Sequence, residues 1–458
     1  MPNSIAYLSM IIWPFTILFL LNRYGTAKGI LLSVLAAYLL LPAAFEINFP
    51  GIPALTKDTL TSMVLLAYLI MTRQPIGYKS LKGVHKLVFL LLMISPFMTS
   101  ITNQERYMFI QGLSLYDGLS QAGVGFLNFL PFLLGLAYFK TYERQVVLLR
   151  LVGVAAVFYA LPVLWEIRMS PQLHTTLYGY FPHSFIQQYR EGGFRAVVFL
   201  GHGLIVAMFL AVGFASLFAV HKAKIRAWRF DNRLLLFLLM VTILLQKSFG
   251  AIIYALIVII VVSMFSYRKT HLFSVAVAAM FLTYPVTSSM GVFPHQQLVN
   301  AAASVSPERA QSLGFRFEQE NTLLEHALKK PLFGWGSWGR NRVYDPETGV
   351  DLSVTDGNWI ATLGSGGWLR FIGWFYFVVM AIYLAYRSQN HLRGAEDEKN
   401  KQLLMSLHSL IVALILIDQM PNSSLQSLYW LIIGGLFGRY GEIQKESQIK
   451  KTVPVNSS

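Results

Sequence analysis

Long runs of apolar residues, separated by short polar stretches, follow one another along most of the chain. A membrane-spanning helix needs roughly 20 predominantly apolar residues, and fewer where protein shields it from lipid. Continuous runs predict helices, because the strands of a membrane β-barrel would alternate apolar and polar positions. Thirteen runs meet or approach this length, and the runs at 59–72 and 233–246 are short: 5–21, 28–44, 59–72, 86–102, 119–139, 146–166, 196–220, 233–246, 249–266, 271–287, 366–386, 402–419 and 424–440. We therefore expect an all-α polytopic membrane protein with about 12–13 transmembrane helices, forming a single bundle over residues 1–458.

The composition agrees with a protein that is solvated by lipid. Apolar residues make up 55% of the 458 positions and charged residues only 13%, against roughly 25% charged residues in soluble domains. The chain has no cysteine, which excludes disulfides, cysteine–zinc sites and thiol nucleophiles. The net charge of +15 does not predict nucleic-acid binding, because the Lys and Arg residues lie in short loops between apolar runs. The first apolar run lacks a basic leader and a small-residue cleavage site, so we expect no cleavable signal peptide.

The basic residues of the loops predict the orientation in the membrane. They fall on one face if the N-terminus is outside and the C-terminus is inside, and the positive-inside rule makes that face cytoplasmic. These residues are Arg73, Lys79, Lys82, Lys86, Lys222, Lys224, Arg226, Arg229, Arg233, Arg268, Lys269, Arg387, Arg393, Lys445, Lys450 and Lys451. The opposite face then carries a first outer loop over 167–195 and a large outer loop over 288–365. Since the cytoplasmic loops are short, we expect the chemistry on the outer face.

The large outer loop contains a predicted amphipathic helix. Ser306 has a side chain suited to an N-cap and Pro307 suits the first helical position, while Pro331 ends or kinks the helix. Arg309 and Arg316 are seven residues apart and so share one face over two turns. An apolar stripe at helical spacing consists of Leu313, Phe317, Leu324 and Leu328. The stripe predicts that this helix lies against the outer membrane–water boundary.

Two features of this loop allow more than one interpretation. Glu320 follows Arg316 by four residues, so the two could form an ordinary ion pair on a solvated helix face. The sequence PLFGWGSWGR after the helix has glycines at 334, 336 and 339, which permit tight turns or close approach of a ligand. HExxH, GxSxG, P-loop and DxD motifs are absent from the sequence, so the common metalloprotease, serine hydrolase, P-loop and nucleotide-sugar chemistries have no support.

Several titratable side chains lie near the outer ends of the predicted spans. Arg190, Arg195 and His202 flank the start of the seventh apolar run, and Lys247 lies between the eighth and the ninth. Charged groups at membrane depth usually face the bundle interior or a water-filled cavity, but Arg195 could instead extend to phospholipid headgroups. Asp356 precedes the eleventh run, where it could form an Asx-turn or a helix cap. Lys247 could be an interfacial turn residue or a cation that points into the same cavity.

Three stretches of the sequence contain Arg, His, Pro and Gly residues in a characteristic order. In GGFRAVVFLGHGLIVAMFLAV an Arg opens a span after the first outer loop, and a His follows. In 316–339 an Arg on a helix is followed by KKPLFGWGSWG, a Pro-Leu-x-Gly-x-Gly ending. TDGNWIATLGSGGWLRFIGWF then leads into the next span. In this order the stretches resemble the O-antigen ligase and O-antigen polymerase superfamily of bacterial membrane glycosyltransferases. The motifs cover about 190–205 and 305–375, and the architecture is similar over nearly the whole chain.

The chain departs from the family pattern at two positions. Asp356 stands where most members have the His that is thought to act on the acceptor. Lys247, in KSFGA, is displaced by one or two positions from the cation of the family's Ser-Arg-Gly-Ala span opening. The departure at Asp356 concerns which residue acts as the catalytic base. The departure at Lys247 concerns which residue supplies one of the cations of the site.

The resemblance implies a GT-C-like fold and transfer of a glycan from an undecaprenyl-pyrophosphate carrier to an acceptor hydroxyl, without a metal or cofactor. Arg195 and Arg316 would stabilise the charge that develops on the pyrophosphate. Asp356 would be the catalytic base, with His202 as the reserve candidate. Further substrate-binding candidates are Arg190, His202, Lys247, Arg309, Trp335, Trp338 and Trp359. These tryptophans and Tyr344 can stack on sugar rings, although interfacial aromatic belts explain outer Trp and Tyr equally well.

The resemblance also implies a location and partners. The protein would be a multi-pass component of the bacterial inner membrane, in contact with lipid and a lipid-linked glycan, and a chain-length regulator and a flippase could join it. We favour a polymerase of lipid-linked repeat units in O-antigen or exopolysaccharide synthesis, because Asp356 departs from the ligase pattern. An O-antigen ligase that transfers glycan to lipid A core is one alternative. A non-catalytic flippase or transporter is another, and it predicts internal repeats and helices interrupted near the midplane. A structural partner in polysaccharide assembly is a third.

Overall fold

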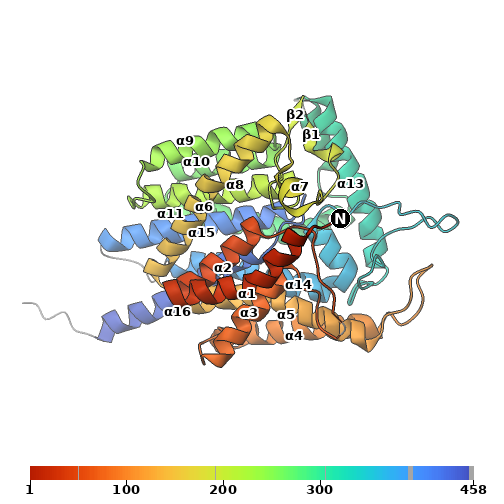
Figure 1. The fold of residues 1–458 in the computed structure, drawn as a ribbon, viewed down its shortest axis with the longest axis horizontal. Helices are drawn as coiled ribbons and strands as arrows, with labels where there is room; N and C mark the ends of the chain where they lie inside the picture. The colour runs from red at the N-terminus through yellow and green to blue at the C-terminus, as the bar shows by residue number, and fades with distance from the viewer. Residues whose placement is uncertain (50, 191, 305, 390–395, 453–458) are drawn as a thin grey trace, which may run out of the picture.

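The computed structural model describes residues 1–49, 51–190, 192–304, 306–389 and 396–452, and nearly all of its regular structure is helical (Figure 1). The helices that coincide with the thirteen apolar runs are α1 (Ser4–Tyr24), α2 (Thr26–Leu40), α3 (Lys57–Met71), α4 (Val84–Ile101), α5 (Leu115–Tyr138), α6 (Tyr142–Met169), α8 (Gly203–Lys222), α9 (Asn232–Leu245), α10 (Phe249–Met264), α11 (Tyr267–Ser289), α14 (Asn358–Ser388), α15 (Glu396–Asp418) and α16 (Ser427–Thr452). The other elements are the helices α7 (Leu173–Tyr178), α12 (His295–Ala303) and α13 (Pro307–Leu328), the 3₁₀ turns η1 (Tyr78–Ser80) and η2 (Ile186–Gln188), and the antiparallel strands β1 (Tyr189–Arg190) and β2 (Gly193–Phe194).

The described helices have the lengths and composition of a multi-pass membrane protein. Eight of them are long and apolar enough to cross a membrane: α1, α4, α5, α6, α8, α11, α14 and α15. The apolar helices α2, α9 and α10 are shorter, at 10–17 residues. The prediction of an all-α polytopic membrane protein is confirmed at this level. The count of 12–13 spans requires α2, α3, α9, α10 and α16 to cross the membrane as well. This count stays a prediction.

Most of the long helices run along the long axis of the molecule, so the connections between them gather at its two ends (Figure 1). The N-terminus lies at one end together with α7, the β1–β2 pair and α13, whereas α16 extends towards the other end (Figure 1). The backbone N–H of Asn3 donates to the carbonyl of Tyr178 at 2.9 Å, which fixes the N-terminus to the segment after α6. We call this end the amino end. The two segments predicted as outer loops both lie there, on the same side as the N-terminus.

The centre of the bundle contains a close crossing of α5 and α16. A Cβ added at Gly135 would lie 2.3 Å from the carbonyl oxygen of Leu431, and one added at Gly434 would lie 2.0 Å from that of Phe132. Small residues that let two backbones approach this closely are a usual basis of helix packing in lipid, where apolar burial gives little driving force. The crossing makes α16 a central helix and fixes the position of α5, which carries residues of the cavity described below.

The chain enters α8 through a buried segment that is not helical. The apolar run predicts a span over 196–220, but α8 begins only at Gly203, so this prediction is wrong for its first turns. Glu166 of α6 supplies the physical reason. Its Oε2 accepts hydrogen bonds from the backbone N–H groups of Val197 and Val198, each at 2.8 Å, and its Oε1 accepts one from Leu173 at 2.8 Å. Non-helical backbone is tolerated at membrane depth only where such partners satisfy it.

A second buried side chain holds this segment from the other side. The Oε1 of Gln246, which follows α9, accepts from the N–H of Ala196 at 3.0 Å, and its Nε2 donates to the carbonyl of the same residue at 2.7 Å. Val198 has a φ of +47°, a conformation that a β-branched residue rarely adopts and that persists only where its surroundings enforce it. The segment is therefore rigid, and it fixes the backbone of Arg195, which immediately precedes it.

Helix α14 is interrupted nine residues after its start, at Gly367, where φ is +64° and ψ is −168°. Segment 331–336 fills the interruption. The backbone hydrogen bonds between the two are Trp368 N to Pro331 O (2.7 Å), Leu369 N to Leu332 O (3.2 Å), Trp335 N to Gly364 O (2.9 Å) and Gly336 N to Ser365 O (2.9 Å). A Cβ at Gly334 would lie 2.5 Å from the nitrogen of Gly367. The sequence suggested Gly334 for a tight turn or for close approach of a ligand. In the structure, its lack of a side chain allows segment 331–336 to approach α14 closely.

Candidate functional site

Helix α13 carries two of the predicted cationic residues, Arg309 and Arg316, at the amino end. It begins at Pro307 with Ser306 in the N-cap position and ends at Leu328, as the sequence predicts. The Ser306 hydroxyl bonds to the carboxylate of Glu308 and makes no cap bond to the helix backbone. The residues that α13 buries are Glu320, Leu323, Leu324, His326 and Ala327. Its C-terminal half is therefore anchored in the protein, while Arg316 lies just before the anchored part.

Arg316 and Asp356 form an ion pair at the amino end. The Nε of Arg316 lies 3.4 Å from the Oδ2 of Asp356, and the two side chains are 27% and 42% exposed. Asp356 immediately precedes Gly357, which is the N-cap residue of α14, so the Asp356 side chain is directed to the arginine and does not cap the helix. The fold thus brings together two of the three residues predicted to be catalytic.

Glu320 does not form the ion pair with Arg316 that the spacing allowed. Its Oε2 accepts a hydrogen bond from the hydroxyl of Tyr284 at 2.6 Å, and its Oε1 accepts one from the indole N–H of Trp359 at 3.2 Å. Glu320 therefore joins α13 to α11 and α14. Burial raises the pKa of the Glu320 carboxyl to about 6, although both hydrogen bonds and the nearby Arg316 act in the opposite direction.

Sequence reasoning missed a buried carboxylate, that of Asp418 at the end of α15. Asp418 is 2% exposed, and Arg316 is one of the charged groups near enough to act on it. Its donors are Tyr254 Oη (3.2 Å), Asn422 Nδ2 (2.8 Å) and Ser424 Oγ (2.5 Å). An ionisable residue at the end of an apolar run is a functional candidate by default, so the run at 402–419 already contained this signal.

Arg195 is buried and does not extend to the lipid surface. It is 3% exposed, and its Nη2 donates to the carbonyl of Lys247 at 3.3 Å. Lys247 lies in the turn between α9 and α10 with a φ of +54°. The guanidinium carbon of Arg309 lies 4.3 Å from the ring centre of Phe249, the first residue of α10. The turn before α10 and the first residue of α10 thus contact two of the predicted cations, Arg195 and Arg309.

The other two candidates near the start of the seventh apolar run are His202 and Arg190. His202 is the N-cap residue of α8, and its Nδ1 accepts a hydrogen bond from the N–H of Leu204 at 3.1 Å. Its ring lies edge-on to His183, with 4.8 Å between the ring centres. This capping bond gives His202 a structural role that the sequence did not predict. The backbone of Arg190 belongs to β1, and its side chain lies outside the described residues.

Only one of the three candidate tryptophans offers an open face. Trp359 is 1% exposed and Trp335 is 9% exposed, and Trp335 stacks on His326 with 4.2 Å between the ring centres. Trp338 is 66% exposed. Burial of the first two leaves Trp338 as the tryptophan of this group that can stack on a ligand.

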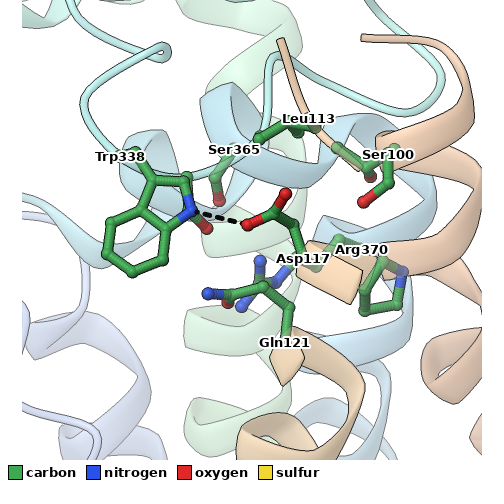
Figure 2. Close-up of a pocket in the computed structure, with 11 residues that line it drawn as sticks. Ser100, Leu113, Asp117, Gln121, Trp338, Ser365 and Arg370 are labelled. Carbon is green, nitrogen blue, oxygen red and sulfur yellow. Dashed lines mark hydrogen bonds between the residues drawn. The ribbon is translucent and has the colours of Figure 1, made fainter. Parts of the chain in front are cut away.

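The exposed indole of Trp338 lies at a small cavity (Figure 2). Its Nε1 donates to the Oδ1 of Asp117 at 3.3 Å. The lining of the cavity includes Gln121, Ser365 and Arg370. The sequence analysis did not select these residues, but an arginine inside the apolar run at 366–386 was a signal that could have found the site. This cavity does not include the ion pair described above.

Among the described residues, no group of three or more His, Asp and Glu side chains converges as a metal site would require. No protein-family model matches the chain, and no curated protein matches it. The evidence for the candidate site is therefore its geometry together with the three sequence motifs.

Proposed function

We propose that this protein is a membrane glycosyltransferase that polymerises undecaprenyl-pyrophosphate-linked oligosaccharide units on the outer face of the bacterial inner membrane. The observation that carries the proposal is the Arg316–Asp356 ion pair, at 3.4 Å and partly exposed. A guanidinium and a carboxylate side by side can supply the two functions that glycan transfer from a pyrophosphate uses. One stabilises the leaving group and the other accepts the proton of the acceptor hydroxyl.

The strength of this ion pair suits a site that opens when its substrate binds. An exposed pair contributes only about 0–1 kcal/mol. A pyrophosphate carries more charge than a carboxylate, and its oxygens match the guanidinium donors. We therefore expect the pyrophosphate to replace Asp356 on Arg316. The Asp356 carboxylate, released from its partner, then lies next to the reacting groups.

The transfer follows as a single displacement. The acceptor oxygen forms a bond to the anomeric carbon as the bond from that carbon to the pyrophosphate oxygen breaks. The hydroxyl proton passes to the Asp356 carboxylate, and Arg316 stabilises the negative charge on the departing pyrophosphate. Arg195, Lys247 and Arg309 add positive charge around the start of α10.

The interrupted helix α14 is the observation that favours the alternative of a transporter. Transporter helices break near the bilayer midplane, and their free backbone groups bind the substrate. In α14 the interruption lies close to the amino end, and Pro331 and Leu332 accept from the backbone N–H groups that follow it. Because segment 331–336 occupies the interruption, the backbone there is not open to a substrate. Segment 331–336 is therefore a fixed part of the fold at this interruption, and we favour the transferase over the transporter.

The test is complementation of a deletion strain at matched membrane expression. The strains carry wild type, Arg316→Ala, Asp356→Asn or the control Arg342→Ala, which removes a similar ion pair to Asp351 (2.7 Å) elsewhere in the loop. We expect single lipid-linked units outside the cytoplasmic membrane but no polymer from the first two variants, and normal polymer from the control. Polymer that is made but not attached to lipid A core would indicate a ligase, and units trapped inside would indicate a transporter. Normal polymer from both site variants would reject the catalytic assignment.

A further inference from the structure

An apolar groove runs between the helices α6 and α9, which pack against each other. Its volume of about 560 Å³ is in the range of sites that bind small molecules. All of its lining residues are apolar or aromatic, and they include Phe158 and Leu161 of α6, Trp228 and Phe230 of the connection before α9, and Leu234 and Phe237 of α9. Except for Trp228, these side chains are exposed, so the described part of the chain leaves the groove open to the surrounding lipid.

The groove reaches one end of the bundle. Helix α8 begins at the amino end and runs through the bundle, so the connection 223–231 that leads from it to α9 lies at the opposite end. Trp228 of this connection packs edge-on against Phe158 of α6, with 4.9 Å between the ring centres, and against Phe230, with 5.3 Å. The basic residues of the loops predict that this end is cytoplasmic, and tryptophan is enriched where a membrane meets water. The groove therefore extends from the apolar core of the membrane to the level of the lipid headgroups.

An arginine of α6 is fixed beside this connection. Arg150 precedes the groove-lining residues Val157 and Leu161 by seven and eleven positions, so all three share one face of the helix. Its Nε donates to the backbone carbonyl of Ala227 at 2.7 Å, and Ala227 is the neighbour of Trp228 in the chain. Arg150 is exposed, and its guanidinium thus lies where the groove meets the membrane surface.

Three more arginines belong to the same end of the groove, Arg226, Arg229 and Arg233, and all are exposed. Arg233 precedes Phe237 by four positions, so it lies on the groove-lining face of α9. Asp231 is the acidic residue of this connection, and it caps α9 by accepting from the backbone N–H of Arg233 at 2.8 Å. Among the described residues, none of the four arginines forms an ion pair with a carboxylate. This end of the groove therefore carries a positive charge that protein groups do not neutralise.

We propose that this groove binds one anionic phospholipid from the membrane leaflet at this end of the bundle. An acyl chain lies along α6 and α9, and the phosphate accepts hydrogen bonds from Arg150 and Arg233, with Arg229 beside them. A guanidinium group is suited to a phosphate because its planar fork donates two parallel hydrogen bonds. Basic pockets between membrane helices on the cytoplasmic side bind anionic lipid headgroups in other proteins.

Charge selects this ligand over the other occupants of an apolar groove. A phospholipid with no net charge would leave the charge of the arginines uncompensated. A second copy of the chain, packed on the same groove about a two-fold axis, would bring two sets of arginines together. The bound phospholipid fixes connection 223–231 to α6 and should raise the unfolding temperature. The inference does not depend on the proposed transferase function.

Retention of lipid measures the binding directly. The full-length protein is delipidated in detergent, mixed with equal amounts of phosphatidylglycerol and phosphatidylethanolamine that have the same acyl chains, and measured by native mass spectrometry. We expect one phosphatidylglycerol molecule to be retained, with an affinity about tenfold or more above that of phosphatidylethanolamine, since each basic residue near an anionic lipid contributes about a fivefold factor. Equal retention of the two lipids, or a dimer that carries no lipid, overturns the proposal.

Charge variants assign the binding to the arginines of the groove. Arg150→Gln/Arg233→Gln should lower the affinity for phosphatidylglycerol about tenfold or more and leave the affinity for phosphatidylethanolamine unchanged. The control Arg73→Gln/Arg268→Gln removes the same charge from other loops that the sequence places on this face, and it should bind as wild type does. Equal losses in the two double variants would show that only the net charge matters, which overturns the proposal.

A steric variant tests the groove itself. Leu161 and Leu272 are each 59% exposed, and of these two Leu161 lines the groove. Leu161→Trp fills the groove without a change of charge and should lose the retained lipid, whereas Leu272→Trp on α11 should keep it. Retention by Leu161→Trp equal to that of its control overturns the proposal. Arg316→Ala should retain the lipid as wild type does, whether or not transfer activity is lost.

Discussion

The guanidinium of Arg316 lies 3.4 Å from the carboxylate of Asp356, although forty residues separate the two in the chain. One belongs to the amphipathic helix α13 and the other to the segment that enters α14. The pair joins the second and third sequence motifs at one place. The same helix places Glu320 against α11 and α14, which holds α13 where Arg316 can reach Asp356.

Removal of Arg316 should reduce activity far more than stability. A partly exposed ion pair contributes about 0–1 kcal/mol, whereas a group that stabilises transition-state charge is worth about 10²–10³-fold in rate. We expect Arg316→Ala to unfold within a few degrees of wild type and to lose transfer activity by about that factor. Thermal unfolding and transfer from a lipid-linked donor measure the two effects. The exchanged variant Arg316→Asp/Asp356→Arg should restore the pair but not the activity, and recovered activity would show that only the pairing matters.

Glu166→Ala should destabilise the protein strongly. The substitution leaves the buried N–H groups of Val197 and Val198, and the partly buried N–H of Leu173, without their acceptor. Each unsatisfied buried group costs about 1–3 kcal/mol. We expect the free energy of unfolding to fall by about 3 kcal/mol or more. A lower unfolding temperature and reduced amounts of the protein in the membrane would show this. Glu166→Gln keeps one acceptor oxygen and should lose less.

Glu442→Ala is the matched control for Glu166, because its carboxylate forms only a 3.8 Å pair with Lys140. This control substitution should lower the free energy of unfolding by less than about 1 kcal/mol. Equal stability of the Glu166 and Glu442 variants would contradict the role given to Glu166 in holding the entry to α8.

Gly367→Ala should disrupt the interruption of α14. An alanine at φ +64° and ψ −168° is strained by about 1–3 kcal/mol, and its Cβ would also lie 2.4 Å from the carbonyl of Leu332. We expect a clear fall in unfolding temperature and loss of polymer. Gly125→Ala in α5 has no heavy atom within 4 Å of the new Cβ and should be neutral or stabilising by about 0.5–1 kcal/mol. Similar behaviour of the two variants would argue against close docking of segment 331–336.

Stability should fall as the pH rises through the range in which Glu320 titrates. Its pKa is about 6 in the folded protein, raised by burial from an ordinary value of 4.5. The folded state therefore favours the protonated carboxyl, and this contribution is complete below about pH 4.5 and is lost as the pH rises through 6. Its size is at most about 2 kcal/mol, since one pKa unit corresponds to about 1.4 kcal/mol.

Glu320→Gln isolates that contribution. The amide oxygen can accept from Trp359, and the amide N–H₂ can donate to the hydroxyl of Tyr284. We expect the variant to be no less stable than wild type at pH 7.5 and to lose stability less steeply between pH 4.5 and 7. Unfolding temperatures of both proteins at several pH values measure this. An identical slope in the two proteins would show that other groups cause the dependence.

The sequence by itself determined the thirteen apolar helices, apart from the start of α8, and the extent of α13. Hydrophobic runs and cap residues act over a few neighbouring positions, so each apolar run predicts its helix and Pro307 marks the start of α13. It also selected Arg316 and Asp356 as candidates, through the order of the three motifs.

Only the tertiary structure decided which of these local predictions hold and which residues meet. Val197 and Val198 are apolar and continue a run, yet they are not helical, because Glu166 satisfies their backbone from another helix. Arg370 and Trp338 come from separate segments and line one cavity. Trp359, which the sequence offered as a ligand contact, is enclosed and bonds to Glu320. Such outcomes depend on contacts between distant positions, and local pattern carries no information about them.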